Sequence, residues 1–257
     1  MPIVAVTDPS RVPDGTACAD TVVGLVAHIR ALGPQRDVLL VSHTQAGEAL
    51  ARSARLACGE RTVGLLHVPM TATSFYVTAA ALRMLPDEAL GLASVVTTVL
   101  AGATWTRVLV SRLGEPETPA PSFGQRVRGA FPGARFVVDP VAGVITGEES
   151  LIAPPGVVLV EAHSEPLDKT VDLAGSGAPQ LRLELGAAWR ARRWAEVTVV
   201  TRGLDEIVSH TLHPHSFSYY STCTACARTS WGERCLFCQV PLLVRDDFAI
   251  QNIGGIQ

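Results

Sequence analysis

The sequence lacks several features that would assign the protein to a broad class at once. It has no solenoid-like repeat, and charged residues make up only 18% of its 257 residues. Because the net charge is −3, the chain has no overall attraction for the phosphates of nucleic acids, which disfavours a general DNA- or RNA-binding protein. No Gly-rich dinucleotide fingerprint and no phosphate-binding loop with its lysine occurs. No common nucleotide-binding motif therefore identifies a substrate or a reaction.

Signals for secretion and for membrane insertion are also lacking. Residues 1–6 lead directly into an apolar strand, without the basic segment and cleavage site of a signal peptide. The most apolar long stretch, 89–105, contains one serine and three threonines, and it predicts a buried helix rather than a membrane span. We therefore expect a cytoplasmic protein without a membrane segment. The apolar content of 47% also indicates a homo-oligomer or a protein partner.

What the sequence does contain is a regular alternation of apolar strands and helical stretches. Strands are predicted at 3–7, 38–41, 63–68, 107–111, 135–138, 157–161 and 196–201, with a hairpin partner at 141–146. Helices are predicted at 17–32, 46–57, 73–85, 88–101, 125–131 and 181–195. This spacing indicates βαβ units and a Rossmann-like, mostly parallel α/β sheet in a domain of residues 1–214. The segment 147–156, which contains two adjacent prolines, is the best candidate for an internal boundary, and it could also be a long connection inside one domain.

Four of the six cysteines form two closely spaced pairs near the C-terminal end. The pattern is C-x2-C-x8-C-x2-C, formed by Cys223, Cys226, Cys235 and Cys238. Two such pairs can close a tetrahedral shell of four thiolates around one zinc ion, and a reducing compartment favours zinc over disulfides. Four protein ligands leave no open coordination position, which indicates a structural or docking role. The sequence therefore predicts a small zinc-ribbon module at 215–257, whose folding depends on the metal.

Two groups of residues near the cysteines leave alternatives open. Arg228, Trp231 and Arg234 lie between the pairs, where they could contact a phosphate and a base of RNA. Alternatively, Trp231 covers the metal core and the arginines are solvated. His210, His213 and His215 precede the ribbon and could either bind a metal or belong to an extended linker.

The ribbon also suggests a family. The cysteine spacing, followed by the apolar segment 240–244, resembles the C-terminal zinc ribbon of the tRNA thiouridine-forming ATP-pyrophosphatases. The resemblance implies a nucleotide-binding α/β domain in front of the ribbon. That family carries a Ser-Gly-Gly-x-Asp-Ser phosphate loop after its first strand, whereas this chain has Thr7-Asp8-Pro9-Ser10-Arg11 there. The resemblance therefore does not extend to ATP activation.

A second set of candidates follows the predicted strands. Asp8, His43, His67, Asp139 and His163 lie at or near strand ends. Because the ends of parallel strands share one rim, these side chains could converge as metal ligands or as an acid–base pair. Taken singly, residues of these types are more often helix caps, turn formers or core histidines.

The loop before the first predicted helix adds Asp14, which could cap that helix or help to hold an anion. The best catalytic candidates are Asp8, Asp14, His43 and His163. Our first hypothesis is an enzyme that acts on a nucleotide-like or other small polar ligand at the rim. The alternative is a non-catalytic subunit or adaptor that uses the ribbon to dock protein or RNA, and the sequence does not decide between them.

Overall fold

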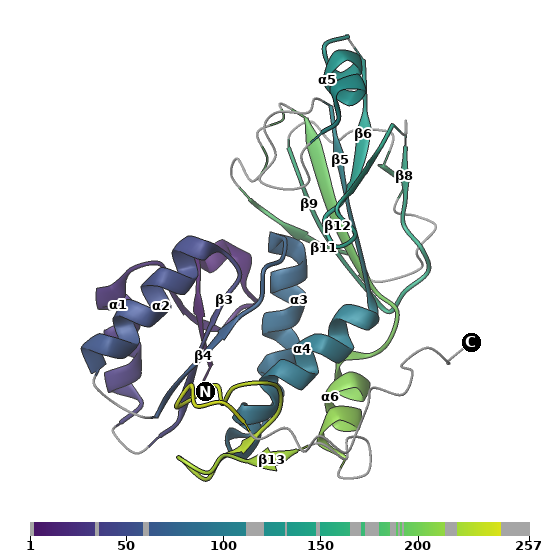
Figure 1. The fold of residues 1–257 in the computed structure, drawn as a ribbon. Helices are drawn as coiled ribbons and strands as arrows, with labels where there is room; N and C mark the ends of the chain where they lie inside the picture. The colour runs from purple at the N-terminus through teal and green to yellow at the C-terminus, as the bar shows by residue number, and fades with distance from the viewer. Residues whose placement is uncertain are drawn as a thin grey trace.

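The computed structural model consists of two α/β lobes, each built around its own sheet (Figure 1). It describes residues 3–33, 36–58, 62–111, 121–131, 133–147, 150–164, 171–172, 180–185, 189, 191, 193–213 and 220–242. Sheet A belongs to the N-terminal lobe and sheet B to the second lobe. The helices α3 (Ala72–Leu82), α4 (Ala93–Gly102) and α6 (Leu204–Leu212) pack on one another where the lobes meet.

Sheet A has four parallel strands in the order β2-β1-β3-β4. Their bounds are β1 (Ile3–Val6), β2 (Ala17–Ala19), β3 (Val38–Ser42) and β4 (Val63–His67). The helices α1 (Val22–Ala31) and α2 (Gln45–Cys58) cover the face that carries Val4 and Leu40. The opposite face, with Ala5 and Val41, joins the core cluster around Phe75 of α3. Because both faces are covered, β1 and β3 are apolar at nearly every position.

Sheet B has six strands in the order β11-β9-β12-β5-β6-β7. They are β5 (Thr104–Val110), β6 (Phe136–Asp139), β7 (Val144–Thr146), β9 (Val158–His163), β11 (Gln180–Leu183) and β12 (Trp194–Val200). Only the β11–β9 pair is parallel among the described strands of this sheet. One face packs on α3, and the other carries a separate apolar cluster with Leu109, Leu151 and Val197.

The remaining described elements are short. They are the 3-10 helices η1 (Pro9–Arg11) and η2 (Asp87–Leu92), the helix α5 (Phe123–Gly129), and the strand pairs β8 (Leu151–Ile152) with β10 (Val171–Asp172) and β13 (Ser221–Thr222) with β14 (Thr229–Ser230). The β13–β14 hairpin belongs to the cysteine segment, which packs beside β4.

The α/β class and the parallel sheet expected from the sequence are confirmed, and so is the hairpin partner of β6. The start of the first predicted helix is wrong. Residues 17–19 form β2, which pairs with β1, and α1 begins only after Thr21, whose hydroxyl accepts from the N–H of Gly24 at 3.2 Å. Pairing with a neighbouring strand outweighs the helical periodicity of these three residues.

The predicted helix at 181–195 is also wrong. Residues 180–183 form β11 beside β9, and β12 begins at Trp194. The leucines at 181, 183 and 185 alternate at the spacing of a strand, and Leu183 is buried whereas Leu181 is 39% exposed. The arginine-rich residues that follow suggested a helical face and obscured this alternation.

The segment 147–156 lies between β7 and β9 of the second lobe. Of the ribbon module expected at 215–257, the structure describes residues 220–242. Within the described part of the chain, no helix is both long and apolar enough to cross a membrane.

Candidate metal centre and ligand site

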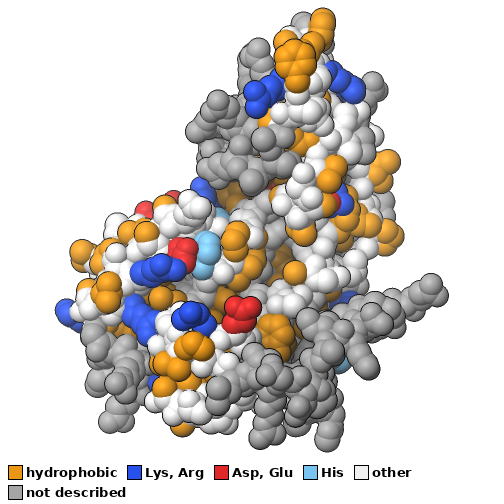
Figure 2. All heavy atoms as spheres, in the orientation of Figure 1, with side chains coloured by type: hydrophobic (Ala, Val, Ile, Leu, Met, Phe, Trp, Pro, Cys, Tyr) orange, Lys and Arg blue, Asp and Glu red, His pale blue; other side chains and the backbone are white. Residues whose placement is uncertain are grey.

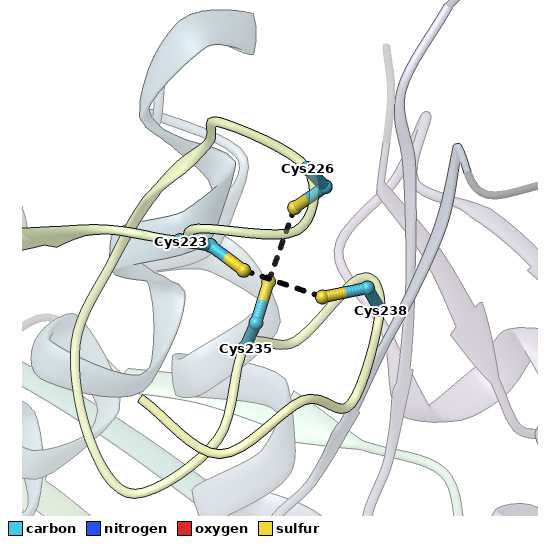
Figure 3. A group of neighbouring side chains, drawn as sticks. All are labelled: Cys223, Cys226, Cys235 and Cys238. Atoms are coloured by element: carbon cyan, nitrogen blue, oxygen red, sulfur yellow. Dashed lines mark hydrogen bonds between the residues drawn. The ribbon is translucent and has the colours of Figure 1, made fainter. Parts of the chain in front are cut away.

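Two backbone turns bring four cysteines together (Figure 3). The sulfurs of Cys223, Cys226, Cys235 and Cys238 all lie within 4.8 Å of one another. The Cys223–Cys238 sulfur distance is 3.3 Å and the Cys226–Cys235 distance is 3.5 Å. A zinc ion with four sulfurs at about 2.3 Å places those sulfurs about 3.8 Å apart at the corners of a tetrahedron. The cluster therefore has the size and the donor set of a four-thiolate zinc site.

Both cysteine pairs are carried by the same kind of turn. Ala227 and Gln239 directly follow the two pairs, and both have positive φ angles, of 58° and 62°. The Ala227 N–H donates to the Cys223 carbonyl at 2.8 Å, and the Gln239 N–H donates to the Cys235 carbonyl at 2.9 Å. A residue with a side chain pays about 1 kcal/mol for this backbone conformation. The same unfavourable φ angle in both turns is explained if the two cysteine pairs must face one common ligand.

The thiols of the second pair differ strongly in pKa. Burial raises the pKa of Cys238 to about 12. Burial also acts against the Cys235 thiolate, but hydrogen bonds from the Ser230 hydroxyl and from the backbone N–H groups of Cys238 and Phe237 lower the pKa of Cys235 to about 6. Thiolates this close repel one another, so all four can be ionised together only beside a cation. The electrostatics fit a divalent metal ion.

The ribbon, defined here as residues 220–242, covers the free edge of β4. The Leu65 N–H of β4 donates to the Leu236 carbonyl at 2.9 Å. The Phe237 ring is fully buried, and a Cβ added at Gly64 would approach this ring to 3.1 Å. Arg55 of α2 donates to the Phe237 carbonyl. The ribbon thus protects an otherwise unpaired strand edge of sheet A.

Charged and polar contacts fix the ribbon at two further points. The Arg228 guanidinium donates to both carboxylate oxygens of Asp37, at 2.6 and 2.5 Å, and lies 4.5 Å above the Phe237 ring. These hydrogen bonds to Asp37 raise the pKa of Arg228. On the other side, the Ser94 hydroxyl donates to the Trp231 carbonyl at 3.1 Å. Arg228 is therefore engaged inside the protein, and the half-buried Trp231 packs on the core.

The other ribbon candidates have different surroundings. Arg234 is exposed and donates to the Gln239 carbonyl at 3.2 Å. His210 and His213 lie at the end of α6 and are not members of the cysteine cluster. His215 lies outside the described residues.

His43, at the end of β3, is a core histidine of the lobe interface. It is 6% exposed and stacks on Phe75 of α3 with 4.3 Å between the ring centroids. Its Nδ1 donates to the Met70 carbonyl at 3.2 Å, which leaves Nε2 to accept from the Thr7 hydroxyl at 3.5 Å. Burial lowers the pKa of His43 to about 4. The imidazole is therefore neutral at pH 7, and both of its nitrogens have partners.

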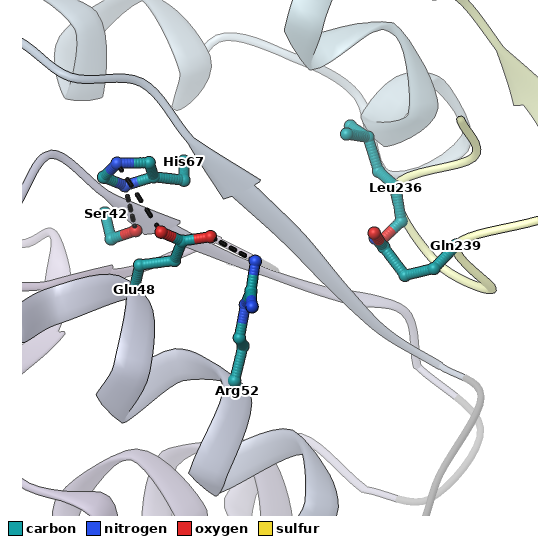
Figure 4. Close-up of polar contacts among 6 residues, drawn as sticks. All are labelled: Ser42, Glu48, Arg52, His67, Leu236 and Gln239. Carbon is teal, nitrogen blue, oxygen red and sulfur yellow. Dashed lines mark hydrogen bonds and ion pairs between the residues drawn. The ribbon is translucent and has the colours of Figure 1, made fainter. Parts of the chain in front are cut away.

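A second histidine forms a polar chain on the other side of the same strand ends (Figure 4). The Ser42 hydroxyl and His67 Nδ1 share a hydrogen bond of 3.0 Å, and His67 Nε2 lies 3.8 Å from a Glu48 carboxylate oxygen. Glu48 also accepts from Arg52 at 2.5 Å. Ser42 and His67 are register partners on β3 and β4. The chain is arranged like a serine–histidine–acid relay, but Ser42 is only 1% exposed and cannot reach a substrate.

The acidic candidates Asp8 and Asp14 lie on the exposed loop after β1. Asp8 caps η1, since its carboxylate accepts from the Ser10 hydroxyl at 2.6 Å and from the Ser10 N–H at 2.9 Å. These hydrogen bonds lower the pKa of Asp8. The Asp14 carbonyl accepts from Arg83, the residue that follows α3, at 2.7 Å. The structure thus gives Asp8 a capping role and uses the backbone of Asp14 to hold α3.

His163 and Asp139 do not share a rim with His43, because they belong to sheet B. His163 is 8% exposed at the end of β9, and its Nδ1 donates to the Ser164 carbonyl at 3.2 Å. Asp139 pairs with Arg107 at 2.8 Å and caps the turn after β6. The expectation of one common rim is therefore wrong, because the second half of the chain builds a separate sheet.

Sequence reasoning missed a buried hydroxyl network that ties α3 to sheet B. The Glu196 carboxylate is 1% exposed and accepts from the Thr73 N–H and hydroxyl, both at 2.7 Å, and from the Trp189 indole at 2.8 Å. The Thr73 hydroxyl also meets Thr198 at 2.6 Å, and Ser74 extends the network. One charged residue within the apolar strand 194–200 was the signal that could have indicated it.

Comparisons with known proteins concern the fold alone. No protein-family model matches the sequence, and no curated protein is detectably similar to it. A DegV family protein from Corynebacterium glutamicum has a similar structure, with a TM-score of 0.53 and 12% identity over 78% of this chain and 97% of that chain. This likeness supports a DegV-like α/β fold.

Two further solved structures are more distant. A DegV family protein from Eubacterium eligens, loaded with heptadecanoic acid, has a TM-score of 0.47 and 9% identity over 78% of this chain and 99% of that chain. The fatty acid kinase B3 protein of Streptococcus pneumoniae, loaded with linoleic acid, has a TM-score of 0.45 and 11% identity over 71% of this chain and 76% of that chain.

The resemblance to the tRNA thiouridine-forming ATP-pyrophosphatases is wrong, because the fold resembles that of a DegV family protein instead. A cysteine spacing specifies only a local metal-binding turn. Ribbons of this kind can be attached to unrelated α/β cores, and the missing phosphate loop was the more informative observation.

Proposed function

We propose that this protein is a non-catalytic binding subunit with a structural zinc ribbon. The observation that carries this proposal is that three of the polar side chains at the strand ends are already engaged within the protein. Both nitrogens of His43 have partners, Asp8 caps η1, and Ser42 is buried. General acid–base catalysis needs a titrating group that can reach its substrate, and these groups do not meet that requirement. The alternative of an enzyme is therefore the weaker one.

The ligand that suits the strand ends has one polar group and an apolar body. The His67 side chain is 21% exposed, and its Nε2 lies beyond hydrogen-bonding distance of Glu48. Thr71, at the start of α3, donates to Ser74 and keeps acceptor capacity on its own oxygen. Figure 2 shows that the molecule is hollowed between the two lobes and that hydrophobic side chains lie along this hollow. The polar group of the ligand would bind at His67 and Thr71, and its apolar body would lie in this hollow.

A ligand screen tests this proposal. Two of the structures described above hold long-chain fatty acids, so the panel begins with heptadecanoic and linoleic acids and includes short-chain acids and a neutral nucleoside. We expect native mass spectrometry to detect a stoichiometric complex with a long-chain ligand, and we expect the combined change His67→Ala and Thr71→Val to weaken it.

The matched control is His210→Ala, an exposed histidine at the end of α6. The proposal would be contradicted if the protein bound none of the long-chain ligands, or if it converted any compound of the panel into a product.

The cysteine cluster completes the proposal. We propose that residues 215–257 form a module whose four cysteines bind one zinc ion. With four thiolates the ion has no open position, so it would hold the ribbon on β4 rather than act on a ligand. A binding protein without a reaction of its own needs a second protein to use its ligand, so a protein partner is part of this proposal.

A further inference from the structure

The helix α5 exposes its hydrophobic side chains to solvent. Phe123 is 83% exposed, Val127 48% and Phe131 66%. The three residues recur every four positions and therefore lie along one side of the helix and its last turn. Figure 1 shows α5 at the tip of the second lobe, and Figure 2 shows hydrophobic side chains gathered at this tip. We call Phe123, Val127 and Phe131 the tip stripe.

The protein holds α5 through polar groups instead of through the tip stripe. Ser122 and Gln125 form a capping box, and the Gln125 amide also donates to the Ile145 carbonyl of β7 at 2.7 Å. The Arg128 guanidinium lies 5.8 Å from the centre of the buried Phe136 ring. A surface helix normally packs its apolar side against the protein core. In α5 the apolar side faces solvent instead. The tip stripe contributes little to folding and is free for another surface.

Among the described residues of α5 and its flanks, at 121–131 and 133–138, every charged side chain is basic. Arg126 and Arg128 are exposed, and Figure 2 shows basic side chains on both flanks of the tip. The segment 121–138 contains three arginines and no acidic residue, although the whole chain carries a net charge of −3. The positive charge is thus local and adjoins the exposed phenylalanines. This combination complements a surface that is apolar inside and anionic at its boundary.

We propose that the tip stripe and its flanking arginines dock the protein onto an anionic lipid bilayer. The tip stripe lies on a protruding tip and not in a groove. This shape favours insertion between lipid head groups over binding of a side chain from a protein partner. Phenylalanine rings enter the boundary between head groups and acyl chains, and the arginines reach the lipid phosphates. A second copy of this chain is a poor occupant, because the arginines of two tips would repel each other. The proposal is independent of the ligand proposed above.

Vesicle co-sedimentation of the full chain tests the docking. We expect binding to vesicles of phosphatidylcholine and phosphatidylglycerol in equal parts, weak binding to phosphatidylcholine alone, and release by high salt. The double change Phe123→Ser and Phe131→Ser should reduce the affinity by at least about tenfold, because it removes most of the inserted apolar area. The change Arg126→Gln with Arg128→Gln should remove the preference for anionic lipid.

The matched control is Leu56→Ser, which removes an 82% exposed leucine from α2 on the other lobe and should leave binding unchanged. Circular dichroism checks that each variant is folded. Equal binding by the wild type and both tip variants, or no binding to anionic vesicles, would overturn the proposal. Binding of polyglutamate without binding of vesicles would also overturn it and would assign the tip to an acidic protein.

Discussion

The cysteine ribbon and the ends of the sheet A strands build polar sites in opposite ways. In the ribbon, the first and last cysteines are 15 positions apart, and each pair is shaped by hydrogen bonds within its own turn. At the strand ends, Thr7 meets His43 from 36 positions away and Ser42 meets His67 from 25 positions away. Under the proposed function the first site would depend on a metal ion to hold local ligands together, whereas the second depends on the register of a parallel sheet. They should therefore fail in different ways.

Removal of one cysteine of the cluster should produce the largest effect. We expect Cys235→Ser to release the metal and to lower the free energy of unfolding by at least about 5 kcal/mol, because metal binding supplies folding energy to a small module. Elemental analysis and urea denaturation measure the two quantities. Cys58→Ser, at the end of α2 and outside the cluster, is the control. If the wild-type protein were stable without any metal, the ribbon would not differ from the strand ends in needing a metal ion to fold.

Acid should lower the free energy of unfolding by protonating His43 at the end of β3. This effect should be intermediate in size. Because burial lowers the pKa of His43 to about 4 from its usual 6.5, the unfolded chain binds more protons than the folded chain between these values. This contribution to stability is complete above pH 6.5 and is lost as the pH falls towards 4, by at most about 3 kcal/mol.

Urea midpoints measured between pH 4 and pH 7 check this, and His43→Gln should flatten the profile relative to the wild type. An unchanged slope in that variant would assign the acid sensitivity to other groups.

The contact between the ribbon and sheet A should give the smallest effect. Arg228→Ala should cost about 1 kcal/mol, since the side chains of Arg228 and Asp37 are 22% and 28% exposed and the pair is partly screened by solvent. A double-mutant cycle with Asp37→Asn isolates the coupling. Arg202→Ala serves as the control, because Arg202 forms an exposed ion pair with Glu206 of α6. Zinc content should stay at the wild-type level. Loss of zinc in Arg228→Ala would show that the ribbon cannot hold its metal without the sheet.

The sequence predicted the features that depend on residues close together along the chain. The cysteine spacing identified the cluster, and alternating apolar segments identified the α/β class and β1, β3 and β4 of sheet A. It also selected His43 as unusual, although as a catalytic candidate rather than as a core residue. It misjudged residues 17–19 and 181–195, where pairing with a distant strand determines the local structure.

The partners within the Ser42–His67–Glu48 chain and within the Glu196 network could not be derived from the sequence, although Glu196 stands out as the charged residue of an apolar strand. The first requires the register that places Ser42 beside His67, and the second requires α3 to begin against β12. Neither register nor helix packing leaves a short-range pattern, because both are set by the total burial of apolar side chains from several elements.

The sequence by itself determined the set of four clustered cysteines and the alternation of strands and helices, because short-range spacing fixes which side chains share a turn or a face. Only the tertiary structure decided that the strands divide into two sheets, that His43 and His163 belong to different lobes, and that the ribbon covers the edge of β4. These outcomes depend on which distant surfaces pack together. The free energy of that packing is a property of the whole chain and of no single segment.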